Sequence, residues 1–161
     1  MKNIDSVTDL PNVPAVYAMY GGRGRGLHVA YVGIADALKR RVMQHLIKRD
    51  SSVATGTSAA ALNPDYITEV SWWEHPDFSE RHVLQAAELV AFDFLEPALR
   101  SRGAIQEKAQ ELYADESFNE KMTAFFQTEP TGKLIILTLQ DTLEKISELE
   151  RRVDELEKLI K

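Results

Sequence analysis

The chain has 161 residues, 44% hydrophobic and 27% charged, a composition typical of a globular protein with one principal domain. It contains no cysteine, which excludes disulfide scaffolds and zinc sites built on thiolates. The net charge of −6 is unevenly distributed, because residues 1–50 carry eight Lys and Arg against four Asp and Glu. A local basic face can bind phosphates on an acidic protein, so composition neither supports nor excludes nucleic acid.

Apolar runs in the sequence are short. The longest aliphatic stretch, LIIL at residues 134–137, is too short to cross a bilayer. The first residues, MKNIDSVTDLP, lack the apolar run of a signal peptide. We therefore expect a cytoplasmic protein with no membrane partner.

The first two predicted elements are strands joined by a glycine-rich turn. Residues 13–20 and 28–33 are rich in β-branched and aromatic side chains, which favours strands. The sequence GGRGRG between them lacks the lysine and the following helix of a phosphate-binding Walker A loop. We interpret it as a hairpin turn in which Arg23 and Arg25 can contact a nucleic-acid backbone.

Two helices and a third strand follow in the chain. The first helix is predicted to reach about residue 49, and a polar loop over 50–64 leads to a strand at 66–75. The second helix is predicted to end near residue 95, before Pro97. The residues expected to cap these helices are Asp36 for the first and Asp77 or Ser79 for the second.

Shorter helices are predicted at 104–113 and 116–127, with a break at 130–132. Two strands, a helix, a third strand and then helices form the order of an α+β domain, with one sheet flanked by helices. We divide the chain into a principal domain (1–104), a helical connector (105–138) and a C-terminal segment (139–161).

The C-terminal segment has a heptad pattern. Its charges agree with a parallel pair, since Lys145 and Arg152 at position g would meet Glu150 and Glu157 at position e of the partner. The pattern predicts a parallel coiled coil that makes a homodimer through 139–161; the alternative is one amphipathic helix packed against its own domain. The residues at positions a and d are Leu139, Thr142, Ile146, Leu149, Val153, Leu156 and Ile160.

Glu88 stands out on the second predicted helix. It shares a helix face with Leu84, Ala91, Phe92 and Leu95. A carboxylate within an apolar stripe is costly unless it is hydrogen-bonded, paired or bound to a cation. Glu88 is therefore a structural ion-pair partner, a residue at the stripe's edge, a metal ligand or a general base.

Four further polar side chains are predicted to converge with Glu88 on one face of the sheet. Arg41 and His45 lie one turn apart among apolar residues of the first helix, and the two hairpin strands carry Tyr17 and Tyr31. Separately, each is explained as a core residue or as an arginine that extends to solvent. Together with a carboxylate they form the set that phosphodiester hydrolysis uses: a base for water, a cation for the phosphate and a metal ligand.

Four segments, taken in order, resemble the GIY-YIG nuclease superfamily over about residues 12–102: AVY (15–17), YVG (31–33), ALKRRVMQHL (37–46) and AAELVAF (86–92). The resemblance implies a small three-stranded antiparallel sheet flanked by helices. It also implies a metal-dependent DNA endonuclease with one Mg²⁺ or Mn²⁺ in each active site.

By position, Tyr17 and Tyr31 match the tyrosines of the two motifs. The resemblance implies that one of them, with His45, positions or deprotonates the attacking water. It assigns Arg41 to the scissile phosphate and Glu88 to the metal. Gly33 matches the glycine that ends the second motif.

The sequence departs from the family pattern. Ala15 and Val16 replace the first motif's glycine and isoleucine, and Arg100 stands where the family usually has an asparagine. A catalytically impaired nucleic-acid-binding module and a dimeric adaptor therefore remain alternatives. The residues expected to contact DNA are Arg23, Arg25, Lys39, Arg40, Arg100 and Arg102.

Overall fold

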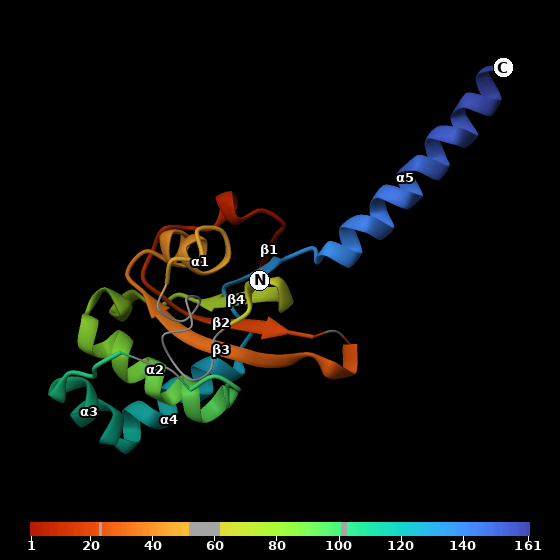
Figure 1. Cartoon of the computed structure of the whole chain (residues 1–161). Coiled ribbons are helices and arrows are strands. Elements are labelled where there is room, and N and C mark those ends of the chain that lie inside the picture. Colours follow the sequence, from red (N-terminus) through yellow and green to blue (C-terminus); the bar gives the residue numbers. More distant parts are fainter. Residues whose placement is uncertain (23, 52–61, 101–102) are drawn as a thin grey trace.

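The computed structural model describes residues 1–22, 24–51, 62–100 and 103–161 (Figure 1). Within these ranges the protein is α+β, as predicted, and its strands form one five-stranded mixed sheet. The strands are β1 (Lys2–Ile4), β2 (Ala15–Gly21), β3 (His28–Ala35), β4 (Ile67–Trp73) and β5 (Gly132–Ile135). Their order across the sheet is β1-β5-β4-β2-β3.

The predicted three-stranded antiparallel sheet is wrong in its number of strands. The three predicted strands are present, with β2 antiparallel to both β3 and β4. However, β5 extends the sheet beside β4, and β1 pairs with β5 in parallel. These two strands have four and three residues, too few for a periodic signal, and each pairs with a segment far away in the sequence.

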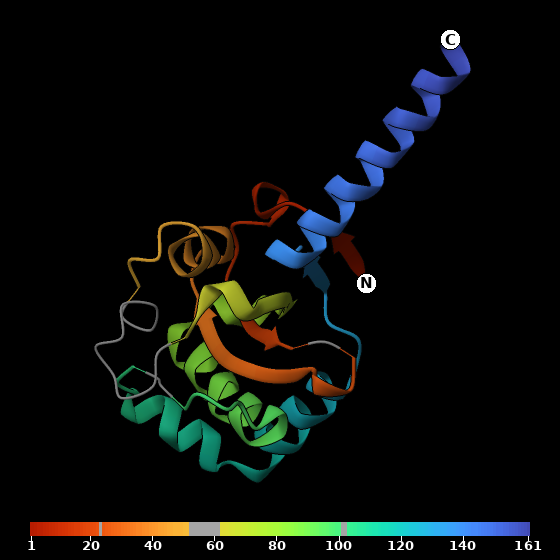
Figure 2. The same ribbon diagram turned by 45° about the vertical axis from the view of Figure 1, so that its right-hand side comes forward.

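The helices cover both faces of the sheet. Helix α1 (Leu38–Leu46) lies on one face, and α2 (Arg81–Leu95) lies on the other (Figures 1 and 2). The apolar side chains accordingly form two cores, one that includes Leu38 and Val42 of α1 and one that includes Leu84 of α2. The short 3-10 helices are η1 (Val7–Asp9), η2 (Gly24–Gly26), η3 (Pro64–Tyr66) and η4 (Pro76–Ser79).

The predicted helix caps are wrong at both sites. Helix α1 begins after Ala37 with no side-chain cap, because the Asp36 carboxylate pairs with Arg81 instead. Helix α2 begins after Glu80, also without a side-chain cap, since the chain before it forms η4. The predicted end of α2 is confirmed, because the helix stops at Leu95.

The segment 105–138 contributes to both the sheet and the core. Helices α3 (Glu107–Ala114) and α4 (Glu116–Gln127) lie on the α2 side, where Met122 and Phe126 of α4 are buried. Strand β5 then pairs with β4, and Gly132 lies opposite Trp72. A Cβ atom at Gly132 would lie 2.1 Å from Cζ2 of that indole, so the close approach requires glycine.

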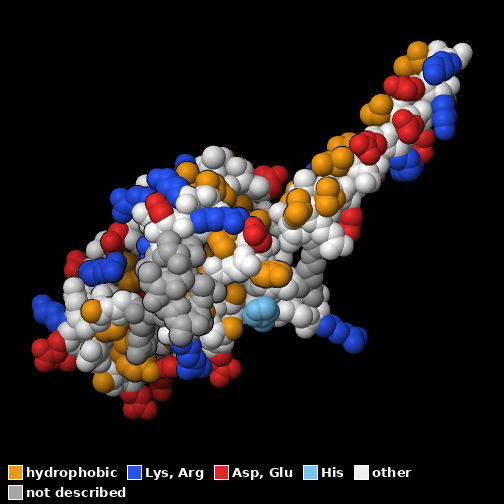
Figure 3. Space-filling model, viewed as in Figure 1, with side chains coloured by type: hydrophobic (Ala, Val, Ile, Leu, Met, Phe, Trp, Pro, Cys, Tyr) orange, Lys and Arg blue, Asp and Glu red, His pale blue; other side chains and the backbone are white. Residues whose placement is uncertain are grey.

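The last helix, α5 (Leu139–Ile160), projects from the body of the molecule (Figure 1). Thr138 and Asp141 form a capping box that fixes its start. None of its residues is buried, which contradicts the alternative that it packs against its own domain. Apolar side chains follow one side of this helix (Figure 3). Among the described residues, no helix is both long enough and apolar enough to span a bilayer.

Candidate active site

Side chains from three elements line one polar cavity of about 140 Å³: Tyr31 from β3, Arg41 from α1 and Glu88 from α2. The prediction that Glu88 and Arg41 share one sheet face is wrong, because α2 and α1 pack on opposite faces. Strand β3 is the last in the strand order, so both helices can still reach its outer edge. The edge of β3 is partly covered by the chain after α2, where Leu99 N–H donates to the Ala30 carbonyl over 2.9 Å. The cavity lies beyond this contact, toward the end of β3.

Glu88 is 4% exposed and lies in the middle of α2. Its carboxylate is close enough to Tyr31 to raise the pKa of that phenol. The position of Glu88 within the apolar stripe is thus explained by the cavity at the sheet edge, where the carboxylate faces polar groups instead of the hydrophobic core.

Tyr17 and His45 form a hydrogen-bonded pair behind the cavity. The phenol oxygen of Tyr17 lies 2.7 Å from Nε2 of His45, and neither side chain has any exposed surface. The other ring nitrogen, Nδ1, lies 2.8 Å from the hydroxyl oxygen of Ser51. When Tyr17 donates to Nε2, Nδ1 carries the proton and donates to Ser51; in the other tautomer both directions reverse.

The buried pair is uncharged at neutral pH. Burial, aided by the Arg41 cation, lowers the pKa of His45 to about 4. Burial also raises the pKa of Tyr17 well above its usual value; Tyr31 adds to this increase and Arg41 opposes it. A neutral imidazole can accept a hydrogen bond from a neighbouring phenol, which an imidazolium cannot.

Tyr31 is the tyrosine that reaches the cavity. Its ring centroid lies 6.1 Å from that of Tyr17 and 5.4 Å from that of His45. The pKa of Tyr31 is raised overall by burial; Arg41 opposes this increase and Glu88 adds to it. Of the two predicted tyrosines, Tyr31 therefore lines the polar cavity, while Tyr17 belongs to the layer behind it.

Arg41 lines the cavity and also acts electrostatically on the buried pair of Tyr17 and His45. Burial lowers the pKa of its guanidinium, but Tyr17 and Tyr31 raise it, and the net change is upward. One N–H group, on Nη1, donates to Oε1 of Gln44 over 3.2 Å, which holds the side chain along α1. The arginine is therefore a fixed, permanent cation beside the two phenols.

Gly33 gives Tyr17 the space to reach His45. The two residues are opposite each other in the β2–β3 pairing. A Cβ atom at Gly33 would lie 2.6 Å from the phenol oxygen of Tyr17 and 2.9 Å from the Tyr31 ring. The glycine of the YVG segment is thus required by the crossing aromatic rings.

The residues predicted to contact DNA lie in different places. Arg40 is exposed and Lys39 half-buried on the first turn of α1. Arg25 is exposed in η2, at the opposite, hairpin end of β3. Arg100 is exposed after α2. Arg23 and Arg102 lie outside the described residues.

Two cavity residues were missed by the sequence analysis. Arg81 and Gln85 line the same cavity as Glu88. Gln85 accepts from Gln106 N–H and donates to the Ala104 carbonyl, both over 3.1 Å, which holds the incoming chain against α2. Helical spacing contained the signal, because positions 81, 85 and 88 recur on one helix face.

The donor groups fit a hard divalent cation that binds weakly to protein. Mg²⁺ and Mn²⁺ prefer oxygen ligands, and Mg²⁺ commonly takes only one or two carboxylates, with water and substrate phosphate supplying the rest. Glu88 provides such a carboxylate beside the Tyr31 phenol. Within the described ranges, no group of three or more His, Cys, Asp or Glu gathers to form a closed cage.

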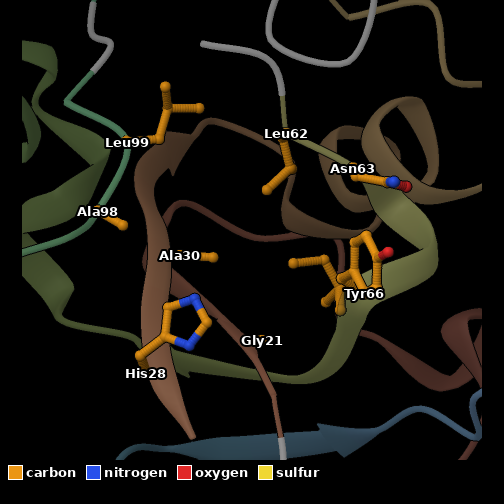
Figure 4. A pocket seen from close by; sticks show the side chains of 9 residues that line it. Gly21, His28, Ala30, Leu62, Asn63, Tyr66, Ala98 and Leu99 are labelled. Atoms are coloured by element: carbon orange, nitrogen blue, oxygen red, sulfur yellow. The ribbon is translucent and has the colours of Figure 1, made fainter. Parts of the chain in front are cut away.

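A separate pocket of about 350 Å³ opens near the hairpin end of β3, on the other side of the Leu99 contact (Figure 4). Its lining is largely apolar and includes Ala30, Leu62 and Leu99, with Tyr66 and His28 at its sides. Its described lining residues include no arginine or lysine, whereas those of the smaller cavity include two arginines. The two arginines therefore distinguish the smaller cavity from this largely apolar pocket.

No protein-family model, curated protein or solved structure matches this chain.

Proposed function

We propose that the protein is a metal-dependent DNA endonuclease of the GIY-YIG kind. The observation that carries this proposal is the convergence of Tyr31, Arg41 and Glu88 on one cavity from three separate elements. The same cavity thus has a phenol, a fixed cation and a nearly buried carboxylate. These are the groups needed to orient water, offset phosphate charge and hold a metal.

The proposed reaction is hydrolysis of a phosphodiester. The oxygen of a water attacks phosphorus, one P–O ester bond breaks, and the departing oxygen becomes a hydroxyl by taking up a proton. The water loses one proton, so protons balance overall. Arg41 offsets the negative charge that develops on the phosphate oxygens, and Tyr31 orients the water at the cavity wall.

Tyr17 and His45 act through Tyr31 in this proposal. Both are fully buried, so neither contacts substrate directly. Their hydrogen bond fixes the aromatic layer against which Tyr31 packs. Because its pKa is about 4, His45 is neutral at pH 7 and supports Tyr31 as an uncharged hydrogen-bond partner of Tyr17.

Glu88 is the residue that would hold one Mg²⁺ or Mn²⁺. When bound, the cation supplies positive charge that stabilises the phosphate oxygens. The chain contributes a carboxylate shielded from bulk water, which strengthens its interaction with a cation.

Plasmid nicking tests this function. Wild-type protein with Mg²⁺ or Mn²⁺ is expected to convert supercoiled plasmid to open circles, and Glu88→Gln and Arg41→Gln should each lower the rate about a hundredfold or more. Glu155→Gln and Arg49→Gln are matched controls on exposed ion pairs. Nicking that survives Glu88→Gln would contradict the proposal.

A second candidate function is a nucleic-acid-binding module that does not cut. It is favoured by Arg100, an exposed cation at the position where an asparagine is expected. This alternative predicts salt-dependent DNA binding by wild-type protein and no cleavage with any divalent metal. The nicking assay and a binding isotherm on the same protein therefore separate the two functions.

The enzyme is also proposed to act as a homodimer through α5. The projecting helix exposes an apolar seam that includes Ile146, Leu149 and Val153. Charges beside the seam complement a second parallel copy, as the g and e positions require. Two linked active sites could then reach both strands of a duplex.

Sedimentation velocity of full-length variants tests the dimer. Leu149→Asp places a charge in the seam and should yield monomer, whereas Ser147→Asp adds the same charge outside the seam and should not. Because no α5 residue is buried in the chain's own domain, both variants should fold normally. A dimer that survives Leu149→Asp would eliminate the coiled coil.

A further inference from the structure

A second polar cavity, of about 380 Å³, adjoins the candidate active site. The two cavities share Ile34, Arg41 and Arg81 as lining residues. The second one lies where β3 ends and α1 begins, and Arg40 and Gln44 of α1 form much of its wall. It is therefore a direct continuation of the site that contains Tyr31 and Glu88.

The lining of this second cavity is predominantly cationic. Arg40, Arg41 and Arg81 supply three guanidinium groups from two helices, against one carboxylate, Asp36. Guanidinium groups are planar forks of N–H donors that match phosphate oxygens in geometry and charge. Arg81 also lies at the first position of α2, where the helix dipole adds positive potential.

Asp36 forms an ion pair with Arg81. The Arg81 guanidinium donates through Nη1 to Oδ1 of Asp36 over 3.1 Å. The two side chains are 46% and 67% exposed. An ion pair that exposed contributes little stability, so a phosphate can replace the carboxylate on Arg81 at small cost.

We propose that this second cavity binds the phosphate next to the scissile one on the same DNA strand, with Arg81 and Arg40 as its ligands and Asp36 as the group it displaces. The inference rests on the proposed function. Arg41, shared by the two cavities, faces the scissile phosphate, while Arg81 and Arg40 hold its neighbour. A strand gripped at two successive phosphates is fixed in position along the cleft, which orients the scissile bond toward Tyr31.

The two partners of the ion pair should have opposite effects on DNA binding. Arg81→Gln removes a phosphate ligand and is expected to weaken duplex binding roughly five- to tenfold. It should also reduce the slope of log affinity against log salt by about 0.9. Asp36→Asn removes the competing carboxylate and is expected to tighten binding about two- to threefold. A bridge that served only the fold would respond to both changes in the same direction.

The chain offers a matched control pair. Arg49 and Asp65 form an ion pair 2.6 Å long with side chains 50% and 69% exposed, and neither residue lines either polar cavity. Arg49→Gln and Asp65→Asn therefore measure the effect of the same charge changes at a distance. Binding is followed by fluorescence anisotropy of a labelled duplex with chelator present, at salt concentrations from about 50 to about 200 mM.

The outcomes separate this inference from the proposed function. Opposite shifts at Arg81 and Asp36, each larger than its control, support the subsite. An Arg81→Gln affinity within twofold of Arg49→Gln overturns it, even if wild-type protein nicks plasmid. The expected shifts without any nicking would instead support the subsite and overturn the nuclease, leaving a binding module.

Discussion

The phenol oxygen of Tyr17 lies 2.7 Å from Nε2 of His45, and both side chains are fully buried in the core. This pair supports the ring of Tyr31, which alone of the two tyrosines lines the polar cavity. Two phenols that look equivalent in the sequence thus have different surroundings, and substitution should separate their roles.

Replacing each tyrosine by phenylalanine should give contrasting results. Tyr31→Phe removes a hydroxyl at the cavity wall and should lower kcat of DNA cleavage about a hundredfold with little change in stability. Tyr17→Phe leaves a buried nitrogen of His45 without its partner and should lower the free energy of unfolding by about 1–3 kcal/mol. Urea unfolding and single-turnover cleavage measure the two effects. Equal loss of stability in both variants would contradict this division.

The stability of the fold should decrease in mild acid because of His45. Its pKa is about 4 in the folded protein, against about 6.5 in an unfolded chain. Between these values the unfolded state binds more protons, so stability falls as the pH is lowered from about 6.5 to about 4. The loss attributable to His45 approaches about 3 kcal/mol. Urea unfolding of wild-type protein and His45→Gln across this range measures it, and parallel pH profiles would refute the prediction.

Gly33→Ala should disrupt the aromatic layer. The new methyl group would lie 2.6 Å from the Tyr17 oxygen, which its bond to His45 holds in place. We expect a loss of about 1–3 kcal/mol in stability and a loss of cleavage. Gly26→Ala is the control, because no atom lies within 4 Å of that Cβ. Adding Tyr17→Phe to Gly33→Ala removes the atom closest to the new methyl group and should partly relieve the clash. A Gly33→Ala variant as stable as Gly26→Ala would contradict the predicted clash.

Gly132→Ala tests the strand that the sequence did not predict. The added Cβ would lie 2.1 Å from the Trp72 ring, whose indole N–H donates to Glu74 over 3.0 Å. We expect a destabilisation of about 3 kcal/mol, with a shift in tryptophan fluorescence. A wild-type melting temperature for this variant would show that the Trp72 ring does not lie against Gly132.

Local patterns were sufficient for the main elements of the fold. The β-branched hairpin segments became β2 and β3, and the periodic segments became α1 and α2. The short strands β1 and β5 were not predictable, since their stability comes from pairing with distant segments and not from their own sequence. The Asp36 cap failed for a similar reason, because its carboxylate pairs with Arg81, forty-five positions away.

For the candidate site, the sequence by itself determined which side chains share a helix face or a strand. The spacing of Arg41 and His45 and the place of Glu88 in an apolar stripe follow from helix geometry alone. Only the tertiary structure decided which of them meet. The open edge of β3 lets α1 and α2 contribute to one cavity, and the missing Cβ of Gly33 lets Tyr17 cross to His45 while Tyr31 lines that cavity. Such meetings depend on packing between segments far apart in the chain, which no local periodicity encodes.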